Sequence, residues 1–227
     1  MRLLLIRHGQ TPSNVLGLLD TAVPGPGLTD LGRQQAAALP EILVDHQIDA
    51  IFASSQPRAQ LTAAPLAAAR GIEVQIRDGL REIGAGDLEM LGDDRSIRTY
   101  QQTIRRWMSG ELTVTMPGGP SGADVLDRFD AVVAEVVDQL GNTAGADGAA
   151  VLVAHGAVLR LWATVRASDL ASVEGVLGHA HSLQNTGMIV VNGGPDGGWQ
   201  LVSWAGRPIG GPRLADDAAE DPTGEDF

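Results

Sequence analysis

The sequence predicts an α/β fold in which helices cover a mainly parallel β-sheet. Two observations support this fold class. Short uninterrupted apolar runs, such as residues 3–6 and 151–154, are typical of strands buried on both faces of a sheet. Segments whose apolar residues recur at helical spacing separate these runs, and such strand–helix alternation is typical of a parallel sheet.

The predicted elements alternate through the first half of the chain. Thr29 can cap the first helix, Pro57 suits the first turn of the second, and Gly71 can end that second helix. In order, the predicted elements are a strand at 3–6, a helix at 29–43, a strand at 48–53, a helix at 57–70 and a strand at 72–76.

The second half continues the pattern and ends in a hairpin. Ser121 can cap a long helix that carries Val125, Phe129 and Val136 on its buried side. A glycine-rich turn joins the last two strands, which favours a hairpin. The predicted elements are helices at 94–108, at 121–140 and from about 157, and strands at 151–154, 187–192 and 199–204.

The chain has 227 residues, which is enough for one α/β domain with a substantial core. No linker rich in proline, glycine and serine separates two regions of different composition. We therefore predict a single domain over residues 1–212. Residues 213–227 are acidic, rich in small residues and without periodicity, a composition that predicts a disordered tail.

Charge and cysteine content exclude several classes of function. The formal net charge of −12 and the pI near 4.7 argue against binding to nucleic acid or to an anionic membrane surface. The absence of cysteine excludes disulfides, thiolate metal sites and cysteine nucleophiles. No segment approaches the ~20 apolar residues of a membrane span. We therefore expect a cytoplasmic protein without a membrane partner, and homodimer formation is left open.

Histidines and arginines follow the carboxyl ends of three predicted strands. The first strand leads into Arg7 and His8, and the strand at residues 151–154 leads into His155. Arg58 lies in the first helical turn after the second strand. Because active sites of parallel sheets lie at the carboxyl ends of their strands, we expect these four side chains to converge.

A cluster of this composition suits a phosphoryl group. The planar fork of arginine matches phosphate oxygens and keeps its charge at any working pH. A neutral imidazole is a competent nucleophile, and neighbouring arginines favour the neutral form. Fixed positive donors also stabilise the charge that spreads over a phosphoryl group during transfer. A single histidine at a strand end is more often structural, so the prediction depends on the whole cluster.

Further motifs accompany this cluster along the chain. In order, they are Arg7-His8-Gly9-Gln10-Thr11 with Ser13 and Asn14, residues 28–36, Ser54 with Arg58, Leu80-Arg81-Glu82-Ile83, Pro117-Gly118-Gly119, and Ala154-His155-Gly156. The ordered set resembles the histidine phosphatase superfamily, which includes the cofactor-dependent phosphoglycerate mutases, and extends to about residue 192. The resemblance implies a three-layer α/β sandwich of the phosphoglycerate mutase type.

The same resemblance implies a phosphatase that acts through a phosphohistidine, with a small phosphorylated metabolite as its substrate. In that scheme His8 is the nucleophile, and Glu82 gives a proton to the leaving oxygen and later takes one from water. A partly enclosed pocket would raise the pKa of Glu82 as this role requires. The resemblance implies no metal and no cofactor. The groups it implies as phosphate ligands are Arg7, Arg58, His155, Asn14 and the backbone at Gly156.

The chain departs from the family pattern at a few positions. Pro120 stands where the family usually has a glutamate, and Met90 stands where a glycine is common. Ala85 and Ala157 replace the tyrosine and asparagine with which the mutases grip their acid substrate. These last two differences favour a phosphatase over a mutase.

Three alternatives are weighed against this reading: a phosphoglycerate mutase, a non-catalytic phosphate-binding protein and a metal-dependent phosphatase. The intact cluster with Glu82 argues against a non-catalytic protein, and no aspartates cluster as a metal-dependent phosphatase would require. His179 and His181 have the spacing of a metal-binding pair, but no third ligand is obvious and we favour a loop. Asp87 and Glu89 either line the pocket or lie on the surface.

Overall fold

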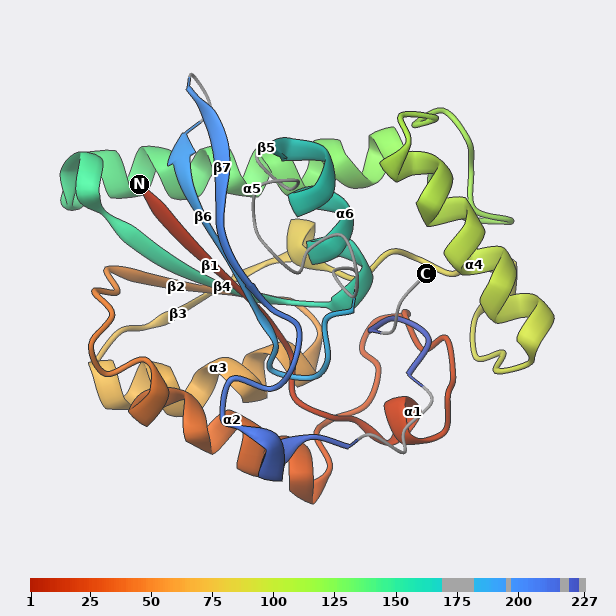
Figure 1. Ribbon diagram of the computed structural model, residues 1–227, viewed down its shortest axis with the longest axis horizontal. Helices are drawn as coiled ribbons and strands as arrows, with labels where there is room; N and C mark the ends of the chain where they lie inside the picture. The colour runs from red at the N-terminus through yellow and green to blue at the C-terminus, as the bar shows by residue number, and fades with distance from the viewer. Residues whose placement is uncertain (169–181, 195–196, 217–220, 225–227) are drawn as a thin grey trace.

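Figure 1 shows the computed structural model of the protein, which describes residues 1–168, 182–194, 197–216 and 221–224. Within these residues, one sheet contains seven strands in the order β3-β2-β4-β1-β6-β7-β5. The strands are β1 (Arg2–Arg7), β2 (Ala50–Ser54), β3 (Val74–Arg77), β4 (Ala149–Ala154), β5 (Ala167–Ser168), β6 (Met188–Gly194) and β7 (Gly198–Ala205).

The centre of the sheet is parallel, and one side of it is antiparallel. Strand β4 lies between β1 and β2 and is parallel to both, while β3 extends the parallel part beyond β2. On the other side of β1, strands β6 and β7 form the antiparallel hairpin that the sequence predicts. The prediction of a mainly parallel α/β sheet is therefore confirmed.

Helices cover both faces of the sheet and produce three layers (Figure 1). Along β1, Leu3 and Leu5 pack into a core shared with α4, α5 and α6, whereas Leu4 and Ile6 pack into a second core shared with α2 and α3. This division follows from the alternation of side chains along a strand. The helices are α1 (Pro12–Val15), α2 (Asp30–Ile42), α3 (Pro57–Arg70), α4 (Asp94–Met108), α5 (Gly122–Thr143) and α6 (Gly156–Arg166).

The predicted capping residues begin and end these helices. The side chain of Thr29 accepts a hydrogen bond from the Gly32 amide at the start of α2. Ser121 forms a reciprocal capping box with Asp124 at the start of α5. Gly71 ends α3 in the left-handed conformation, with φ of 65°. These local signals are why the helix boundaries agree well with the sequence.

Some elements were not anticipated from the sequence pattern. The four-residue helix α1 and the two-residue strand β5 are too short to show a period. Helix α6 begins at Gly156, directly after His155, so that the amino-terminal end of the helix lies at the predicted cluster.

Among the described helices, none combines the length and the apolar character that crossing a bilayer requires.

The structure describes part of the segment after residue 212, for which disorder stays a prediction. A short 3₁₀ helix at Pro212–Leu214 rests on α2, where the Gln35 amide donates to the Leu214 carbonyl at 2.7 Å. Residues 221–224 lie against the end of β1, with Asp221 and Thr223 buried. Asp221, one of the acids of this segment, forms an ion pair with the buried Arg7.

Candidate active site

Strands β1 and β4 bring the two histidines together at the carboxyl edge of the sheet. Arg7 pairs with Ala154 in the parallel register, and the His8 amide donates to the Ala154 carbonyl at 3.0 Å. The next residue of each strand is therefore a histidine at the same level. The rings of His8 and His155 meet edge to face with centroids 5.1 Å apart.

The imidazole of His8 is held in one tautomer. Its Nδ1 lies 2.7 Å from the Gly9 carbonyl oxygen, which can only accept, so Nδ1 carries the proton. The lone pair then resides on Nε2. Burial, followed by the charges of Arg58 and Arg7, lowers the pKa of His8 well below its ordinary value of 6.5. A buried, neutral imidazole with a free Nε2 lone pair is the form required of a nucleophile.

Two buried guanidinium groups flank this histidine. Arg58, in the first turn of α3, donates from Nη2 to the Asp20 carbonyl at 3.1 Å. Arg7 donates from Nη1 to the Leu183 carbonyl at 2.9 Å. In the part of the chain that the structure describes, Arg7 Nε and Arg58 Nη1 are buried without a hydrogen-bond partner. Unpartnered buried cationic donors are costly, and a bound anion would supply the acceptor that they lack.

His155 is fully buried, and both of its ring nitrogens are engaged. Its Nε2 lies 2.8 Å from the Ser54 hydroxyl, and Arg58 Nε donates to its Nδ1 at 3.3 Å. Burial and then the charge of Arg58 lower the pKa of His155 well below 6.5. A phosphoryl oxygen would therefore have to take the place of one of these two partners to receive a hydrogen bond from His155.

Glu82 lies deep in the site, and protein groups surround its carboxyl. Its oxygens accept from the amides of Ile83 at 2.8 Å, Ala157 at 3.1 Å and Val158 at 2.9 Å. Burial raises the pKa of Glu82 above its ordinary value of 4.5, and these amide donors reduce the shift without cancelling it. A carboxyl with a raised pKa is suited to donate a proton near neutral pH.

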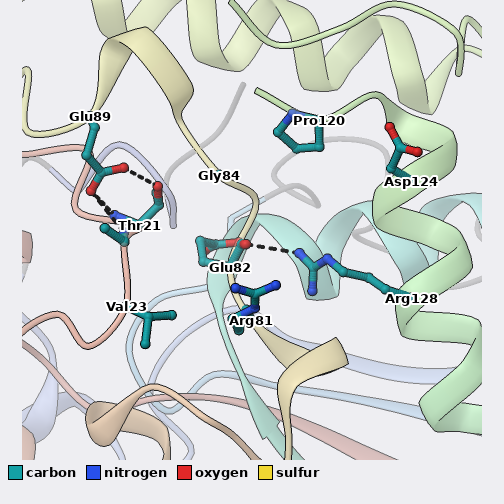
Figure 2. Close-up of a pocket in the computed structure, with 10 residues that line it drawn as sticks. Thr21, Val23, Arg81, Glu82, Gly84, Glu89, Pro120, Asp124 and Arg128 are labelled. Atoms are coloured by element: carbon teal, nitrogen blue, oxygen red, sulfur yellow. Dashed lines mark hydrogen bonds between the residues drawn. The ribbon is translucent and has the colours of Figure 1, made fainter. Parts of the chain in front are cut away.

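A pocket of about 390 Å³ opens beside Glu82. Figure 2 shows Arg81 and Arg128 near Glu82, with Glu89 and Thr21 hydrogen-bonded to each other at one side of the pocket. Pro120, at the position where the family pattern has a glutamate, lies on the wall of this pocket. The lining residues are Thr21, Ala22, Val23, Arg81, Glu82, Gly84, Glu89, Pro120, Asp124 and Arg128.

Asn14 and Gly156 lie at the same site. The Asn14 side-chain carbonyl accepts from the Thr11 amide at 2.9 Å, and its amide donates to Asp221 at 3.2 Å. Gly156 is buried at the start of α6, and a Cβ there would come within 2.4 Å of the Thr223 carbonyl oxygen. The structure thus brings together all seven residues of the predicted site, and their catalytic roles stay predictions.

Glu89 and Asp87, the two carboxylates that the sequence places either at the pocket or on the surface, differ from Glu82 in their surroundings. The Glu89 carboxylate accepts from the amides of Thr21 at 2.7 Å and Ala22 at 2.9 Å, and it also accepts from the Thr21 hydroxyl. It therefore orders the loop at the pocket mouth. Asp87 is exposed.

Sequence reasoning missed several residues that support the site. Gln56 is fully buried: it accepts from the Glu82 amide at 3.0 Å and donates to the Thr21 carbonyl at 3.0 Å. No spacing or motif distinguishes this glutamine in the sequence. Asp221 and Thr223 were missed because they lie in a segment whose composition predicts disorder.

Comparison with known proteins identifies the family of this chain. The pattern of the histidine phosphatase superfamily (branch 1) matches residues 3–206. The chain belongs to the histidine phosphatase superfamily. The family prediction made from the sequence is confirmed.

Several relatives of this histidine phosphatase bear the names of phosphatases. A glucosyl-3-phosphoglycerate phosphatase of Mycolicibacterium vanbaalenii is 34% identical over 89% of this chain and 93% of its own length. A mycobacterial glucosyl-3-phosphoglycerate phosphatase solved with VO3 superposes with a TM-score of 0.71 at 30% identity, covering 89% of this chain and 98% of that one. The predictions of an enzyme and of phosphomonoester hydrolysis are confirmed at this level.

A further relative is longer. A PE-PGRS family protein of Mycobacterium tuberculosis is 40% identical over 90% of this chain. The chain spans 36% of the length of that protein.

Side chains that could bind a metal ion can be assessed only in the described part of the chain. Among the described residues, no three histidine, aspartate or glutamate side chains are grouped as a metal site would require. His179 and His181, which the sequence analysis favours as loop residues, lie outside the described residues.

Proposed function

We propose that this histidine phosphatase hydrolyses a small phosphomonoester through a phosphohistidine formed on His8. One observation carries the proposal: the Gly9 carbonyl fixes the proton on Nδ1 of His8, which leaves the Nε2 lone pair free inside a buried, cationic site. The unpartnered nitrogens of Arg7 and Arg58 mark where the negative charge of a phosphoryl group would be held.

The reaction proceeds in two transfers. In the first, Nε2 of His8 bonds to phosphorus, the bond from phosphorus to the ester oxygen breaks, and Glu82 gives its proton to the departing oxygen. In the second, water attacks the phosphohistidine while the Glu82 carboxylate takes a proton from it. Phosphate leaves, and His8 and Glu82 return to their starting forms. The donors to the phosphoryl oxygens are Arg7, Asn14, Arg58, His155 and the Gly156 amide.

The pocket beside Glu82 receives the rest of the substrate. It combines the cationic side chains of Arg81 and Arg128 with apolar walls at Val23 and Pro120, which favours a polar metabolite over a macromolecule. Relatives bear the names glucosyl-3-phosphoglycerate phosphatase and adenosylcobalamin/alpha-ribazole phosphatase. We therefore propose phosphorylated sugars, sugar acids and nucleoside-like esters as the substrates to screen first.

Trapping of the intermediate tests the proposal. Rapid quenching of the wild-type protein with a ³²P-labelled substrate should give a protein label that is stable in base and lost in acid. His8→Ala should give neither label nor turnover, whereas His46→Ala, which alters a histidine in the loop after α2, should keep both. Label that survives acid, or label retained by His8→Ala, would contradict the proposal. A chelator should leave labelling unchanged, because arginines supply the positive charge in this scheme.

Location and assembly are further proposals. The cytoplasmic location predicted from the sequence stays a prediction, which cell fractionation would test. Homodimer formation stays undecided by the sequence, and light scattering of the purified chain would measure it.

A further inference from the structure

We propose that Asp221 is an internal ligand of the phosphate-binding cluster and competes with the phosphate of the substrate. The inference rests on the proposed function, because it takes Arg7 and Asn14 as phosphate donors. It concerns residues 221–224, which lie more than 200 positions from these donors in the sequence and close to them in space.

The carboxylate of Asp221 binds the donors that a phosphate would use. Arg7 Nη2 forms an ion pair with one carboxylate oxygen, and the Asn14 amide donates to the other at 3.2 Å. The Arg7 side chain is fully buried, and that of Asp221 is 10% exposed. A carboxylate presents two oxygens to a guanidinium fork much as a phosphate does, so the two anions suit the same donors.

The rest of the segment holds this carboxylate in place. The Thr223 hydroxyl donates to Asp221 at 3.1 Å and accepts from Arg7 Nη2 at 3.0 Å. The Leu183 amide donates to the Gly224 carbonyl at 2.7 Å. The Gln101 side-chain amide donates to the Pro222 carbonyl at 3.3 Å. The segment is therefore fixed by backbone as well as by side-chain contacts.

The segment also approaches the site too closely for a side chain at two glycines. A Cβ on Gly224 would lie 1.7 Å from Arg7 Nη1, and a Cβ on Gly156 would lie 2.4 Å from the Thr223 carbonyl oxygen. The backbone of residues 223–224 thus lies close to the Arg7 guanidinium and to the start of α6, where the predicted phosphate donor Gly156 lies.

Competition follows from how the donors are divided. Asp221 engages Arg7 Nη2 and Asn14, while Arg7 Nε and Arg58 Nη1 stay without a partner. A phosphate that enters can use the second pair of donors at once. To gain the first pair it must displace a carboxylate of the same charge sign. Part of the binding energy of the substrate is therefore spent on releasing Asp221, which lowers the apparent affinity.

The alternative is that Asp221 positions Arg7 for catalysis. The two roles predict opposite changes in phosphate affinity when Asp221 is replaced. For Asp221→Asn, competition predicts that inorganic phosphate binds more tightly, by roughly tenfold if the cluster is free in about a tenth of the molecules. Competition also predicts a lower KM for p-nitrophenyl phosphate with kcat retained. A positioning role predicts weaker phosphate binding and a lower kcat.

The experiment is calorimetric titration of the full chain with inorganic phosphate, alongside steady-state kinetics. Asp216→Asn is the matched control, because Asp216 lies in the same part of the chain and accepts from Gln10 at 2.7 Å. It should bind phosphate as the wild type does. Thr223→Ala removes a hydroxyl that holds Asp221 and should tighten phosphate binding by a smaller factor than Asp221→Asn.

Unchanged or weaker phosphate binding by Asp221→Asn, in a variant whose thermal unfolding shows a folded protein, would overturn the inference. If Asp221→Asn does not fold, Thr223→Ala is the deciding variant: tighter phosphate binding supports the inference, and unchanged or weaker binding overturns it. Absence of turnover in the wild type would count against the proposed function alone, since phosphate binding is measured without turnover.

Discussion

The Glu82 carboxyl lies at the amino-terminal end of helix α6, where its Oε1 accepts from the Val158 amide at 2.9 Å. This helix begins directly after His155, so the proposed proton donor contacts the same element that positions His155. The end of a helix carries free amides and partial positive charge, which favour the carboxylate form. Burial opposes them and raises the pKa of Glu82 overall. The site can thus hold the proton for the leaving group and later accommodate the carboxylate.

Replacement of Glu82 by glutamine should affect substrates according to their leaving groups. An alkoxide departs poorly without a proton, so Glu82→Gln should slow hydrolysis of alkyl phosphates by ~10²–10⁴-fold, the usual range for general acid catalysis. An aryl phosphate with an activated leaving group needs less help and should lose less. Steady-state kinetics with an alkyl phosphate and p-nitrophenyl phosphate measure the difference.

Glu89→Gln is the control for this experiment. Glu89 holds the loop at Thr21 and Ala22, so its loss should lower thermal stability and affect both substrates alike. Equal losses for both substrates in Glu82→Gln would assign the proton transfer to another group.

The stability of the protein should decrease as the pH falls below about 6.5, the pKa of histidine in an unfolded chain. His8 and His155 have lowered pKa values in the native state, so at these pH values the unfolded chain binds protons that the native protein does not. Stability then rises with pH. Each histidine contributes up to about 1.4 kcal/mol per pH unit.

Urea unfolding at pH 7 and pH 5 measures this dependence. The difference in free energy of unfolding should be smaller in His8→Asn than in the wild type, because one of the two buried histidines is absent. If His8→Asn showed the same difference in free energy of unfolding between pH 7 and pH 5 as the wild type, His8 would be charged in the native state.

Local signals in the sequence predicted most of the fold. The apolar runs of β1 and β4, the caps at Thr29 and Ser121 and the stop at Gly71 each act over a few residues, so they can be read without the rest of the chain. The convergence of histidines and arginines followed from the rule that parallel strands share one carboxyl edge. The place of β4 between β1 and β2 could not be read in this way, because strand order depends on packing of the whole chain.

The parts that escaped prediction depend on long-range contacts of polar residues. Gln56 connects Glu82 with Thr21, and Asp221 contacts Arg7 across 214 positions. A single glutamine or aspartate gives no period, and its partner cannot be inferred from spacing. Composition then decides the prediction, and an acidic segment rich in small residues is assigned to disorder.

Replacement of Met90 by glycine should stabilise the protein. Met90, which stands where the family commonly has glycine, has a φ of 60°, in the left-handed region. That conformation costs a residue with a Cβ about 1–2 kcal/mol, and the greater freedom of glycine in the unfolded chain offsets part of the gain. We expect a net increase of up to about 1 kcal/mol in the free energy of unfolding.

Urea unfolding measures this change, and Leu91→Gly is the matched control. Leu91 is similarly exposed and its φ is not in the left-handed region, so glycine there should destabilise the protein. A loss of stability in Met90→Gly as large as that in Leu91→Gly would refute the strain at Met90.

Replacement of Arg128 should act on catalysis through Glu82. From helix α5, Arg128 donates to the Gly79 carbonyl at 2.6 Å and to the Glu82 carbonyl at 3.0 Å, as Figure 2 shows for Glu82. Burial lowers the pKa of Arg128 to about 10, so it is still charged at neutral pH. Arg128→Met keeps much of the apolar stem but leaves both carbonyls without this donor, and the backbone that carries the proton donor is then free to shift.

We therefore expect Arg128→Met to slow hydrolysis of alkyl phosphates more than that of p-nitrophenyl phosphate, and Arg128→Lys to recover part of the loss. Arg105→Met, at an exposed arginine of α4, should behave as the wild type.

The decisive measurement is the activity of the double variant, Glu82→Gln with Arg128→Met. If Arg128 acts by positioning Glu82, adding Arg128→Met to Glu82→Gln should cost little further activity toward the alkyl substrate, because the group being positioned no longer donates a proton. If Arg128 only stabilises the fold, the two losses should multiply, and the fraction of folded protein should account for the effect of Arg128→Met on both substrates.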